Sequence, residues 1–577
     1  MTGILMGLGL LSLGNPPGNE FRRPYSWPGS HRPFAPHSPN PAILANSAHA
    51  PITNYDNPSL SQLHAMISST KGYWARHYSL NLGWNNIRYI IESALLHGRL
   101  LNRTVVIPSF VYARSCEYEP DVCGHYVPMV NHGDAVHSDE WRDLPPNEQL
   151  SWRVPISTML NLTLLRNTQP VITVSEYLRL HNLPEHAETA DGSWDRYVYH
   201  MNAGKFTDEA PSIHIVQNTE YDPPQTNRVD FIPSAMKRRG GWVSGGSSGA
   251  GSWRPDPVKS PVYLSLESAL PAKPYVVSWE QARDILEKTG HAHEIRSDFN
   301  METFLNENGW EVLYTYNGAL NMDYIKNVVN PIRQVAPRDS LRGFKEKFGQ
   351  FDEDVLYLEG EIHYERKPGG LRFTTPENRD VFSQLVLYHI RPTHKVYELA
   401  AKIAARMKAM NGGRMWLSAH MRRGDFVRTN WVMEKTLQDH LARIKSKLAI
   451  GRATLQSVYG SKVTTYDVPD AVPDYSVPRT QPPQESDKFY LATDERDPGN
   501  MAYLVEHGAV LVGDVLTLED RREFGWALML TDVLGLVEQA VLAQASYFYA
   551  HAISSYAGGT INMRAAAGLD PRTAVID

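Results

Sequence analysis

The last third of the chain alternates short apolar runs with helical patterns, and this alternation constrains the fold more than any other feature. Met415 to Ala419 is too apolar for a half-solvated strand, so we expect a buried one. Further strands are expected at 489–491, 509–513 and 547–552, and helices at 434–448, 499–507 and 528–545. Strands joined by crossover helices form a parallel sheet. The pattern therefore predicts a doubly wound α/β domain.

A second α/β pattern lies earlier in the chain. An expected helix carries its apolar face on Ile87, Ile90, Ile91, Ala94 and Leu95. Residues 104–107 then predict a strand, which Pro108 closes. Because 577 residues are too many for one hydrophobic core, we expect two α/β domains. They are expected at 66–390 and 391–577, with the change near the break that Pro392 makes in a long helical stretch.

The first 65 residues have a different character. Residues 3–13 are an uncharged apolar run, too short to span a bilayer and without the preceding basic segment of a signal peptide. Residues 15–60 are rich in Pro, Asn, Ser and His, which is typical of a disordered stalk. This layout indicates an enzyme tethered by its N-terminus in the secretory lumen. A truncated anchor and a simple frayed end are both consistent with the apolar run.

Charge and cysteine content exclude several function classes. Acidic residues outnumber basic ones, 63 to 57, and no long basic block occurs, which argues against a nucleic-acid partner. Cys116 and Cys123 fit neither a zinc knuckle nor a CxxC redox pair, and they are either a small disulfide or two thiols. We expect no metal site. A small phosphorylated ligand remains compatible, because one or two arginines can hold it.

Polar residues follow the expected strand at 415–419. They are His420, Arg422, Arg423 and Asp425. In an open α/β sheet, ligands bind beyond the carboxyl ends of the strands. A guanidinium fork matches phosphate oxygens, so two arginines there suit an anionic ligand. A buried Arg–Asp pair that merely closes the strand end fits this stretch equally well.

Two other segments offer the same chemistry. Gly83 allows a close backbone approach or unusual dihedrals, and Asn85 and Asn86 stand at an expected helix start. Helix N-termini favour anions, although an asparagine there can simply be an N-cap. Residues 554–556, Ser-Ser-Tyr, offer hydroxyls and helix amides after the strand at 547–552. A diphosphate in a cleft between two Rossmann-like domains, held mainly by the second, would explain all three segments.

These segments resemble a known family. AHMRRGDF, FYLATD and the tail ASYFYAHAISSYAGGTINMRAAAGLDP, with the early LGWNNIR and LLNRTVVIP, look like the GDP-fucose protein O-fucosyltransferases and their fungal and plant relatives. The resemblance covers about 75–110 and 390–577. It implies a two-domain GT-B glycosyltransferase that takes fucose from GDP-fucose to a protein or glycan hydroxyl. Transfer would invert the anomeric centre without an obligatory metal.

The resemblance also assigns roles to single residues. Arg422 would grip the β-phosphate and the bridging oxygen of the leaving GDP, and Asn85 would lie near the sugar and the phosphates. Glu538 falls where relatives place an acid that binds guanine, and Asp494 closes a family motif. The full set of expected substrate-binding residues is Gly83, Asn86, His420, Asp494, Glu538, Ser554, Ser555 and Tyr556.

One position departs from the family pattern. Some members carry a Glu before the motif glycine as general base, and here that position is Leu82. Members without this acid are thought to react by a dissociative, oxocarbenium-like route, which we expect here. Asp425 is a fallback base, although its simpler interpretation is a salt-bridge partner of an arginine. A GT-B enzyme using another nucleotide sugar, and a non-catalytic GDP-fucose or glycan binder, are the alternatives. For the fucosyltransferase, a location in the secretory pathway, in the Golgi or endoplasmic reticulum, is expected.

Overall fold

The structure is a computed structural model, and residues 54–577 form one compact unit. It describes residues 57–80, 82–114, 151–189, 192–201, 210–221, 223–245, 250–254, 259–272, 275–317, 327–360, 371–428, 430, 432, 434–551 and 554–577. The apolar run at 3–13, nearly all of the expected stalk, Cys116 and Cys123 lie outside this part. No helix within the described ranges is both long and apolar enough to cross a membrane.

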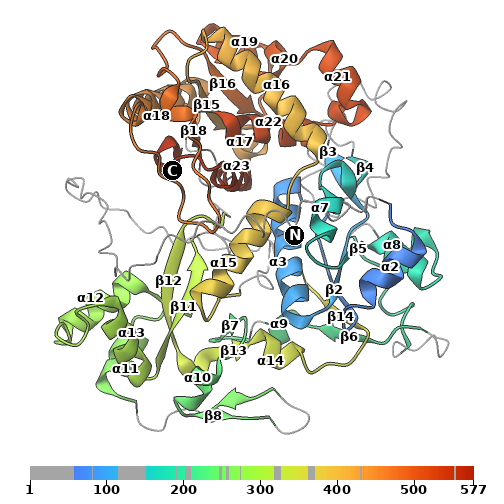
Figure 1. Ribbon diagram of the computed structural model, residues 1–577, viewed down its shortest axis with the longest axis vertical. Helices are drawn as coiled ribbons and strands as arrows, with labels where there is room; N and C mark the ends of the chain where they lie inside the picture. The colour runs from blue at the N-terminus through green and yellow to red at the C-terminus, as the bar shows by residue number, and fades with distance from the viewer. Residues whose placement is uncertain are drawn as a thin grey trace, which may run out of the picture. The chain divides into compact units, whose positions relative to one another are not determined.

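The first sheet has five parallel strands in the order β5–β2–β1–β14–β6 (Figure 1). Its strands are β1 (Tyr73–Arg76), β2 (Thr104–Ile107), β5 (Val171–Thr173), β6 (Ile213–Val216) and β14 (Val355–Leu358). The helices that pack on it include α2 (Leu60–Ile67), α3 (Trp84–Leu101), α8 (Val174–Leu180) and α14 (Phe344–Phe348). The strand expected at 104–107 is confirmed, whereas β14 has no sequence-local partner and was not expected.

Alternate residues of the first sheet enter two separate cores. Trp74, Val105 and Leu356 pack with the apolar face of α3. Tyr73 and Val355 face the other way, toward α2 and α8. Successive side chains of a strand point to opposite faces, so a sheet covered on both sides needs apolar residues at every position. This requirement explains the unbroken apolar runs.

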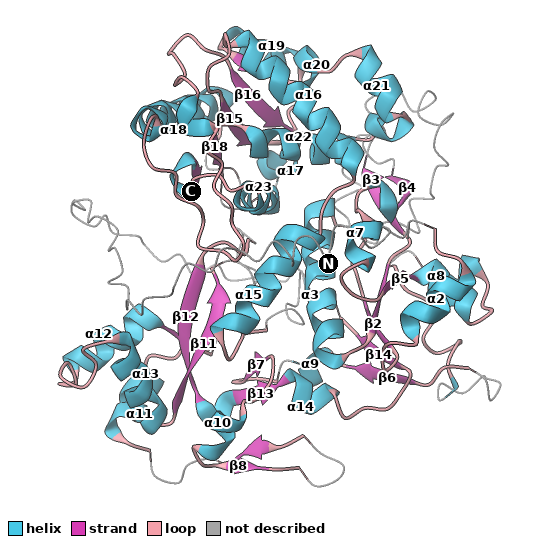
Figure 2. Cartoon of the chain, viewed as in Figure 1, coloured by secondary structure: helices cyan, strands magenta, loops and turns pink. Residues whose placement is uncertain are grey.

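The second sheet is also parallel and five-stranded, in the order β17–β16–β15–β18–β19. Its strands are β15 (Leu417–Met421), β16 (Phe489–Thr493), β17 (Ala509–Val510), β18 (Tyr547–Ala550) and β19 (Ala574–Ile576). Helices α16 (His394–Met410) and α22 (Thr531–Gln544) pack on one face, and α18 (Leu437–Val458) and α19 (Pro498–Glu506) on the other (Figure 2). The predicted α/β class with two doubly wound parallel sheets is confirmed.

Several boundaries differ from those expected. The central strand β15 includes His420 and ends at Met421, because polar His420 is stacked and buried rather than solvated. Strand β17 is only two residues long and is followed by α20 (Val512–Val515). The edge strand β19 was not expected. Further along the chain, β8 (Trp242–Val243) pairs antiparallel with β9 (Ser252–Trp253), and the two tryptophans pack edge to face.

Further elements are inserted between successive strands of the first sheet. An antiparallel sheet β10 (Val277–Ser278), β12 (Pro331–Pro337) and β11 (Trp310–Tyr316) has its own core with α11 (Pro261–Glu267), α12 (Trp279–Lys288) and α13 (Asp298–Glu307). Other short elements are β3 (Phe110–Arg114), β4 (Ser151–Pro155), β7 (Asn227–Val229), β13 (Leu341–Gly343), α7 (Leu162–Arg166), α9 (Asn218–Tyr221) and α10 (Ser234–Arg238).

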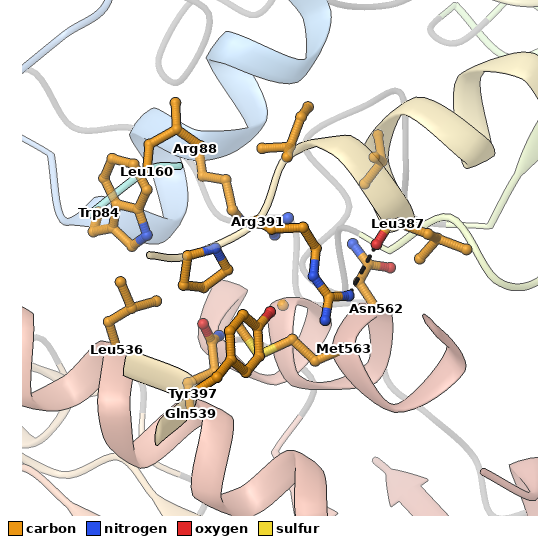
Figure 3. Close-up of a pocket in the computed structure, with 14 residues that line it drawn as sticks. Trp84, Arg88, Leu160, Leu387, Arg391, Tyr397, Leu536, Gln539, Asn562 and Met563 are labelled. Carbon is orange, nitrogen blue, oxygen red and sulfur yellow. Dashed lines mark hydrogen bonds between the residues drawn. The ribbon is translucent and has the colours of Figure 1, made fainter. Parts of the chain in front are cut away.

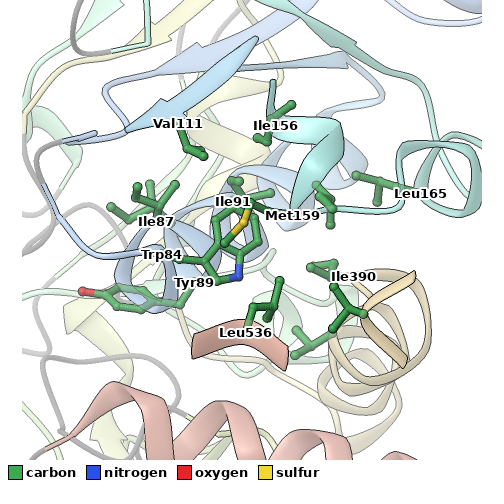
Figure 4. Close-up of a cluster of buried hydrophobic side chains, with 14 of the residues drawn as sticks. Trp84, Ile87, Tyr89, Ile91, Val111, Ile156, Met159, Leu165, Ile390 and Leu536 are labelled. Carbon is green, nitrogen blue, oxygen red and sulfur yellow. The ribbon is translucent and has the colours of Figure 1, made fainter. Parts of the chain in front are cut away.

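A linker then leads from α15 (Pro376–Gln384) through a π-helical turn, Leu385–His389, to α16. The largest core crosses this linker (Figure 4). Trp84 of α3, Ile390 of the linker and Leu536 of α22 belong to one buried cluster. The domain boundary expected near residue 390 stays a prediction; strands of the first sheet end at Leu358 and those of the second begin at Leu417.

Candidate functional site at the switch point of the second sheet

The strand order of the second sheet places a switch point between β15 and β18. From β15 the chain moves outward through β16 and β17, then returns to the opposite side of β15 with β18 and β19. In such sheets ligands bind in the crevice beyond the carboxyl ends of the strands at this point. The residues that follow β15, β16 and β18 are those that the sequence singled out: Arg422, Asp494 and the 554–556 segment.

Arg422 is held at this edge by a carboxylate. Its Nη1 lies 3.0 Å from Oδ2 of Asp494, and 31% of its side chain is exposed. The other oxygen of Asp494 accepts the backbone N–H of Arg423 at 2.7 Å. Gly424 makes this approach possible, since a Cβ there would lie 2.6 Å from Asp494 Oδ2. Asp494 is therefore a described partner of Arg422, and the Asp425 side chain lies outside the described part.

The neighbouring Arg423 has a structural environment. It is buried, with its Nε 3.7 Å from Glu495, and it donates to the backbone oxygen of Thr436 at 3.3 Å. Of the two arginines, only Arg422 has a substantial exposed fraction. The sequence left two interpretations open, an arginine that is available to an anionic ligand and a buried arginine that closes the strand end. Arg423 fits the second interpretation, and the partly exposed Arg422 fits the first.

His420, two residues before Arg422 in the sequence, is buried and neutral. Its ring stacks on Tyr556 with centroids 4.4 Å apart, and its Nδ1 is buried without a hydrogen-bond partner among the described residues. Burial, and then the positive charge of Arg422, lower the pKa of His420 to about 3. His440 and His551, which also lie near it, add to this effect. A neutral imidazole there can donate a hydrogen bond to a ligand or accept one from it, but it contributes no positive charge.

Helix α23 (Ser555–Ala566) begins within the Ser-Ser-Tyr segment at 554–556, the third of the three predicted ligand-binding segments. Ser554 is its N-cap, yet the serine side chain caps none of the helix amides. The Tyr556 hydroxyl already donates to the backbone oxygen of Gly535 at 2.8 Å. The expected cradle therefore has two serine hydroxyls and the helix start, whereas Tyr556 contributes its ring rather than its hydroxyl.

The early asparagines reach the same place through Gln539. Asn85 Oδ1 accepts a hydrogen bond from Gln539 Nε2 at 2.9 Å, and the same nitrogen donates to the backbone oxygen of Tyr556 at 2.8 Å. Because Tyr556 stacks on His420, one chain of contacts joins all three motifs. Asn86 lies at the same helix start, its N–H donating to the oxygen of Gly83 at 2.9 Å.

Gly83 and Leu82 precede α3. Gly83 has φ −67° and ψ 156°, which any residue adopts, so the expectation of unusual dihedrals is wrong. Nothing lies within 4 Å of the position of a Cβ on Gly83, which leaves room for the close approach that was the other expectation. Leu82 is 7% exposed and belongs to the main core. A carboxylate in its place would be buried.

Glu538 is buried next to Gln539 on α22. Its Oε1 accepts the hydroxyl of Tyr490 at 2.9 Å, and burial, followed by the charge of Glu538, raises the pKa of that tyrosine. The guanine contact expected for Glu538 stays a prediction. Gln539 and Tyr490 were missed by the sequence reasoning; for Gln539 the signal was a polar residue next to Glu538 inside the otherwise apolar run 533–543.

The residues that the structure describes form no metal centre. Within these ranges, no group of three or more His, Cys, Asp or Glu side chains is arranged to hold an ion.

Comparison with known proteins gave similarities to solved structures. No protein-family model and no curated protein matches the chain. It is similar to a crystal structure of POFUT1 in complex with GDP-fucose, with 10% identity, a TM-score of 0.32, and coverage of 88% of this chain and 98% of that one. A structure of NodZ alpha-1,6-fucosyltransferase co-crystallised with GDP has 12% identity, a TM-score of 0.19, and coverage of 37% and 51%. Both TM-scores lie below 0.5, so the function has to be argued from the residues of the site.

Fold and site together define the class: an α/β protein with two parallel sheets, in which the partly exposed Arg422, paired with Asp494, lies at the switch point of the second sheet.

Proposed function

We propose that the chain is a glycosyltransferase that transfers fucose from GDP-fucose to a hydroxyl of a protein or glycan, with inversion and without a metal. The observation that carries the proposal is the convergence of three separate motifs at one sheet edge through Asn85, Gln539, Tyr556 and His420. Contacts to the phosphates do not distinguish one sugar from another. The choice of fucose as the sugar therefore rests on the motif resemblance.

In this proposal, Arg422 stabilises the leaving group. As the bond between the anomeric carbon and the diphosphate oxygen breaks, the electron pair stays on the β-phosphate, and Arg422 lies ready to bind that charge. Asp494 fixes the guanidinium before the reaction, which lowers the reorganisation needed in the transition state. The serine hydroxyls and first amides of α23 are suited to the remaining phosphate oxygens.

The acceptor hydroxyl loses its proton late in this mechanism. Leu82 cannot take a proton, and its burial supports a route in which the fucosyl cation develops before the acceptor attacks. His420 is neutral and buried, so it is suited to orient the nucleotide rather than to act as the base. The balanced products are fucosylated acceptor, GDP and one proton.

The burial of Leu82 also favours the second candidate, a non-catalytic binder of GDP-fucose or of a glycan. The two are separated by measuring GDP release from GDP-fucose with and without a mixture of glycoprotein acceptors. Acceptor-dependent release, unchanged by EDTA, is expected of the transferase. Tight GDP binding with release at the background rate would instead indicate the binder.

The donor is tested by thermal stabilisation. A ligand that binds only the native state raises the melting temperature. We expect GDP and GDP-fucose to stabilise the chain more than UDP, UDP-sugars or GDP-mannose. Stronger stabilisation by another nucleotide sugar would overturn the choice of donor. A lumenal Golgi or endoplasmic-reticulum location is part of the proposal, and microscopy of the tagged full chain tests it.

A further inference from the structure

A loop between α18 and β16 joins the end of α23 to the connection between the two sheets. We call this loop, residues 464–474, the strap. Tyr466, near its start, is 7% exposed and belongs to the main core. Near its other end, the Asp474 N–H donates to the backbone oxygen of Gly568 at 3.0 Å, just after α23. A Cβ on Gly568 would collide with the backbone oxygen of Val472, so the strap rests closely on this glycine. Both ends of the strap are therefore fixed.

The apex of the strap contacts the turn through which the chain passes from the first sheet to the second. The Tyr388 hydroxyl donates to the backbone oxygen of Pro469 at 2.9 Å, and Gln384 Nε2 donates to Asp470 Oδ2 at 2.5 Å. Tyr388 lies in the π-helical turn Leu385–His389, and Gln384 directly precedes it. Asp470 has φ 56°, a left-handed conformation that residues other than glycine rarely adopt. The strap thus ties the end of α23 to this turn through a strained residue.

The π-helical turn has an incomplete set of backbone hydrogen bonds. The Ile390 N–H donates to the backbone oxygen of Leu385 at 3.2 Å, five residues earlier. The corresponding bond from Pro392 is impossible because proline has no N–H, and the Arg391 side chain donates instead to the oxygen of Leu387 at 3.0 Å (Figure 3). π-Helical turns are rare and are frequently found at functional sites. At this turn the backbone can change its hydrogen bonding, and with it the direction in which α16 departs.

Two hollows adjoin the connection between α15 and α16. One is a pocket of about 20 Å³, lined by Leu387 and Arg391 of the connection and by Asn562 of α23, among others (Figure 3). The other is a groove of about 380 Å³ between α15 and the strap, with Glu377 on one wall and Asp467 on the other. A hollow supplies no packing contacts, so the two hydrogen bonds of the apex carry much of the hold on it.

The walls of the groove carry like charges. Glu377 and Asp380 lie on α15, and Asp467 lies on the strap. Arg379 also lines the groove and pairs with Asp380 at 2.8 Å, whereas Glu377 and Asp467 form no ion pair with a described residue. Repulsion across the groove opposes closure and weakens as salt screens it. Hydrogen bonds therefore hold the strap closed against a repulsion, which is the balance that a contact able to open requires.

We propose that the strap is a releasable clasp on the π-helical turn and that it fixes the second sheet relative to the first. The closed clasp keeps α23 where Asn562 accepts the backbone N–H of Val328 at 3.0 Å and where Gln539 donates to Asn85 at 2.9 Å. Release lets the turn change its hydrogen bonding and lets these contacts part. The motion does not depend on fucosyl transfer; its effect on the donor site, at the other end of α23, rests on the proposed function.

The test is hydrogen–deuterium exchange of the full chain without ligand. Gln384→Glu removes the donor to Asp470 and places a carboxylate against it, so the clasp should open. We expect severalfold faster exchange at the backbone amides of 385–391 and at Val328, with β15 unchanged, because local opening exposes only the contacts that it breaks. Unchanged exchange at both places, or faster exchange confined to the strap, would overturn the proposal.

Further variants predict both signs of the effect. Glu377→Gln removes one repelling charge and should slow exchange at 385–391, as should higher salt in the wild type. Asp470→Asn keeps an oxygen acceptor and tolerates the left-handed conformation, so it should resemble the wild type. If Gln384→Glu fails to fold, Tyr388→Phe decides, since it removes only the hydroxyl that binds Pro469. Slower exchange in Tyr388→Phe would contradict the clasp.

A matched control and a second readout complete the design. Gln281→Glu makes the same change at an exposed position of α12 and should leave exchange at 385–391 unchanged. An equal response to both Gln→Glu variants would contradict the clasp. GDP should dissociate severalfold faster from Gln384→Glu than from the wild type; equal rates alongside faster exchange would overturn the link to the donor site. A wild type that binds no GDP would overturn the proposed function and leave the exchange test intact.

Discussion

Both sheets are parallel and five-stranded, yet the arginines at their carboxyl edges differ in their partners and in their exposure to solvent. In the first sheet, Arg196 lies near the end of β14, where it donates to Glu359 and to His77, each at 2.9 Å, and covers the ring of Tyr357 at 4.5 Å. In the second sheet, Arg422 is held by one described carboxylate and keeps 31% of its side chain exposed, against 14% for Arg196.

The difference teaches that a switch point alone does not make an anion site. The charges of the first edge pair with each other across β1 and β14, so an anion there would have to displace Glu359. At the second edge, the carboxylate of Asp494 lies to one side, and the N-terminus of α23 follows β18. A diphosphate could bind there beside the more exposed Arg422 without displacing Glu359, which is why we place the donor at the second sheet.

The largest expected effect comes from removing Arg422, the arginine at the carboxyl edge of the second sheet. Arg422→Ala should lower the turnover of GDP-fucose by about 10²–10³-fold, as the loss of one oxyanion donor does, with an unchanged melting temperature. Arg196→Ala is the matched change at the first edge and should lower the melting temperature while turnover stays within a few fold. Initial rates and thermal melts of both variants measure this. Equal rate losses would erase the distinction between the edges.

The next largest effect concerns the contact of Gly559 on α23 with Gln539 of α22 and Asn85 of α3, the helix that packs on the first sheet. A Cβ on Gly559 would lie 2.4 Å from Gln539 Nε2 and 2.9 Å from Asn85 Oδ1. Gly559→Ala should therefore destabilise the chain by about 1–3 kcal/mol in denaturant unfolding. Gly535→Ala, on α22, meets nothing within 4 Å and should stabilise by about 0.5–1 kcal/mol. The same sign for both would show that this contact is not tight.

A smaller effect is expected from the carboxylate that fixes Arg422. Asp494→Asn can still accept the N–H of Arg423 but no longer neutralises the guanidinium. We expect kcat to fall about tenfold, because a misplaced catalytic group costs rate without losing the group itself. GDP should bind at least as tightly, since a negative charge has gone. A loss of GDP affinity equal to the loss of kcat would argue against a positioning role.

The smallest effect is a pH dependence of stability. His420 has a folded pKa of about 3 against about 6.5 when unfolded, so the unfolded chain binds more protons between these values. Its contribution is fully present above pH 6.5 and is lost as the pH falls, by up to about 1.4 kcal/mol per pH unit. The stability advantage of the wild type over His420→Gln should shrink from pH 6.5 to 4.5 in urea unfolding. Parallel curves would contradict a buried neutral imidazole.

The sequence predicted the second sheet better than the first. Its strands and helices alternate within short distances, and the periodic pattern of 528–545 matches α22 closely. The first sheet brings β14 next to β1 across more than 250 residues, and a periodicity carries no information about such pairing. The antiparallel insertion around β11 was missed because its strands pair outside either parallel sheet.

For the site, the sequence predicted which residues stand at strand ends but not how they pair. Asp425 was expected to pair with a neighbouring arginine, which stays a prediction; a described partner of Arg422 is Asp494, which is distant in sequence but follows the neighbouring strand. Gln539 was missed because its role depends on three elements meeting at one amide. Side-chain pairing between separate elements follows from packing, which a single sequence does not display.

The most direct test is a structure of the full chain with GDP bound. We expect the β-phosphate within hydrogen-bond distance of the Arg422 guanidinium and the first residues of α23, with Asn85 nearby. A diphosphate bound at Arg196 and His77, or anywhere that leaves Arg422 paired only with protein groups, would contradict the account.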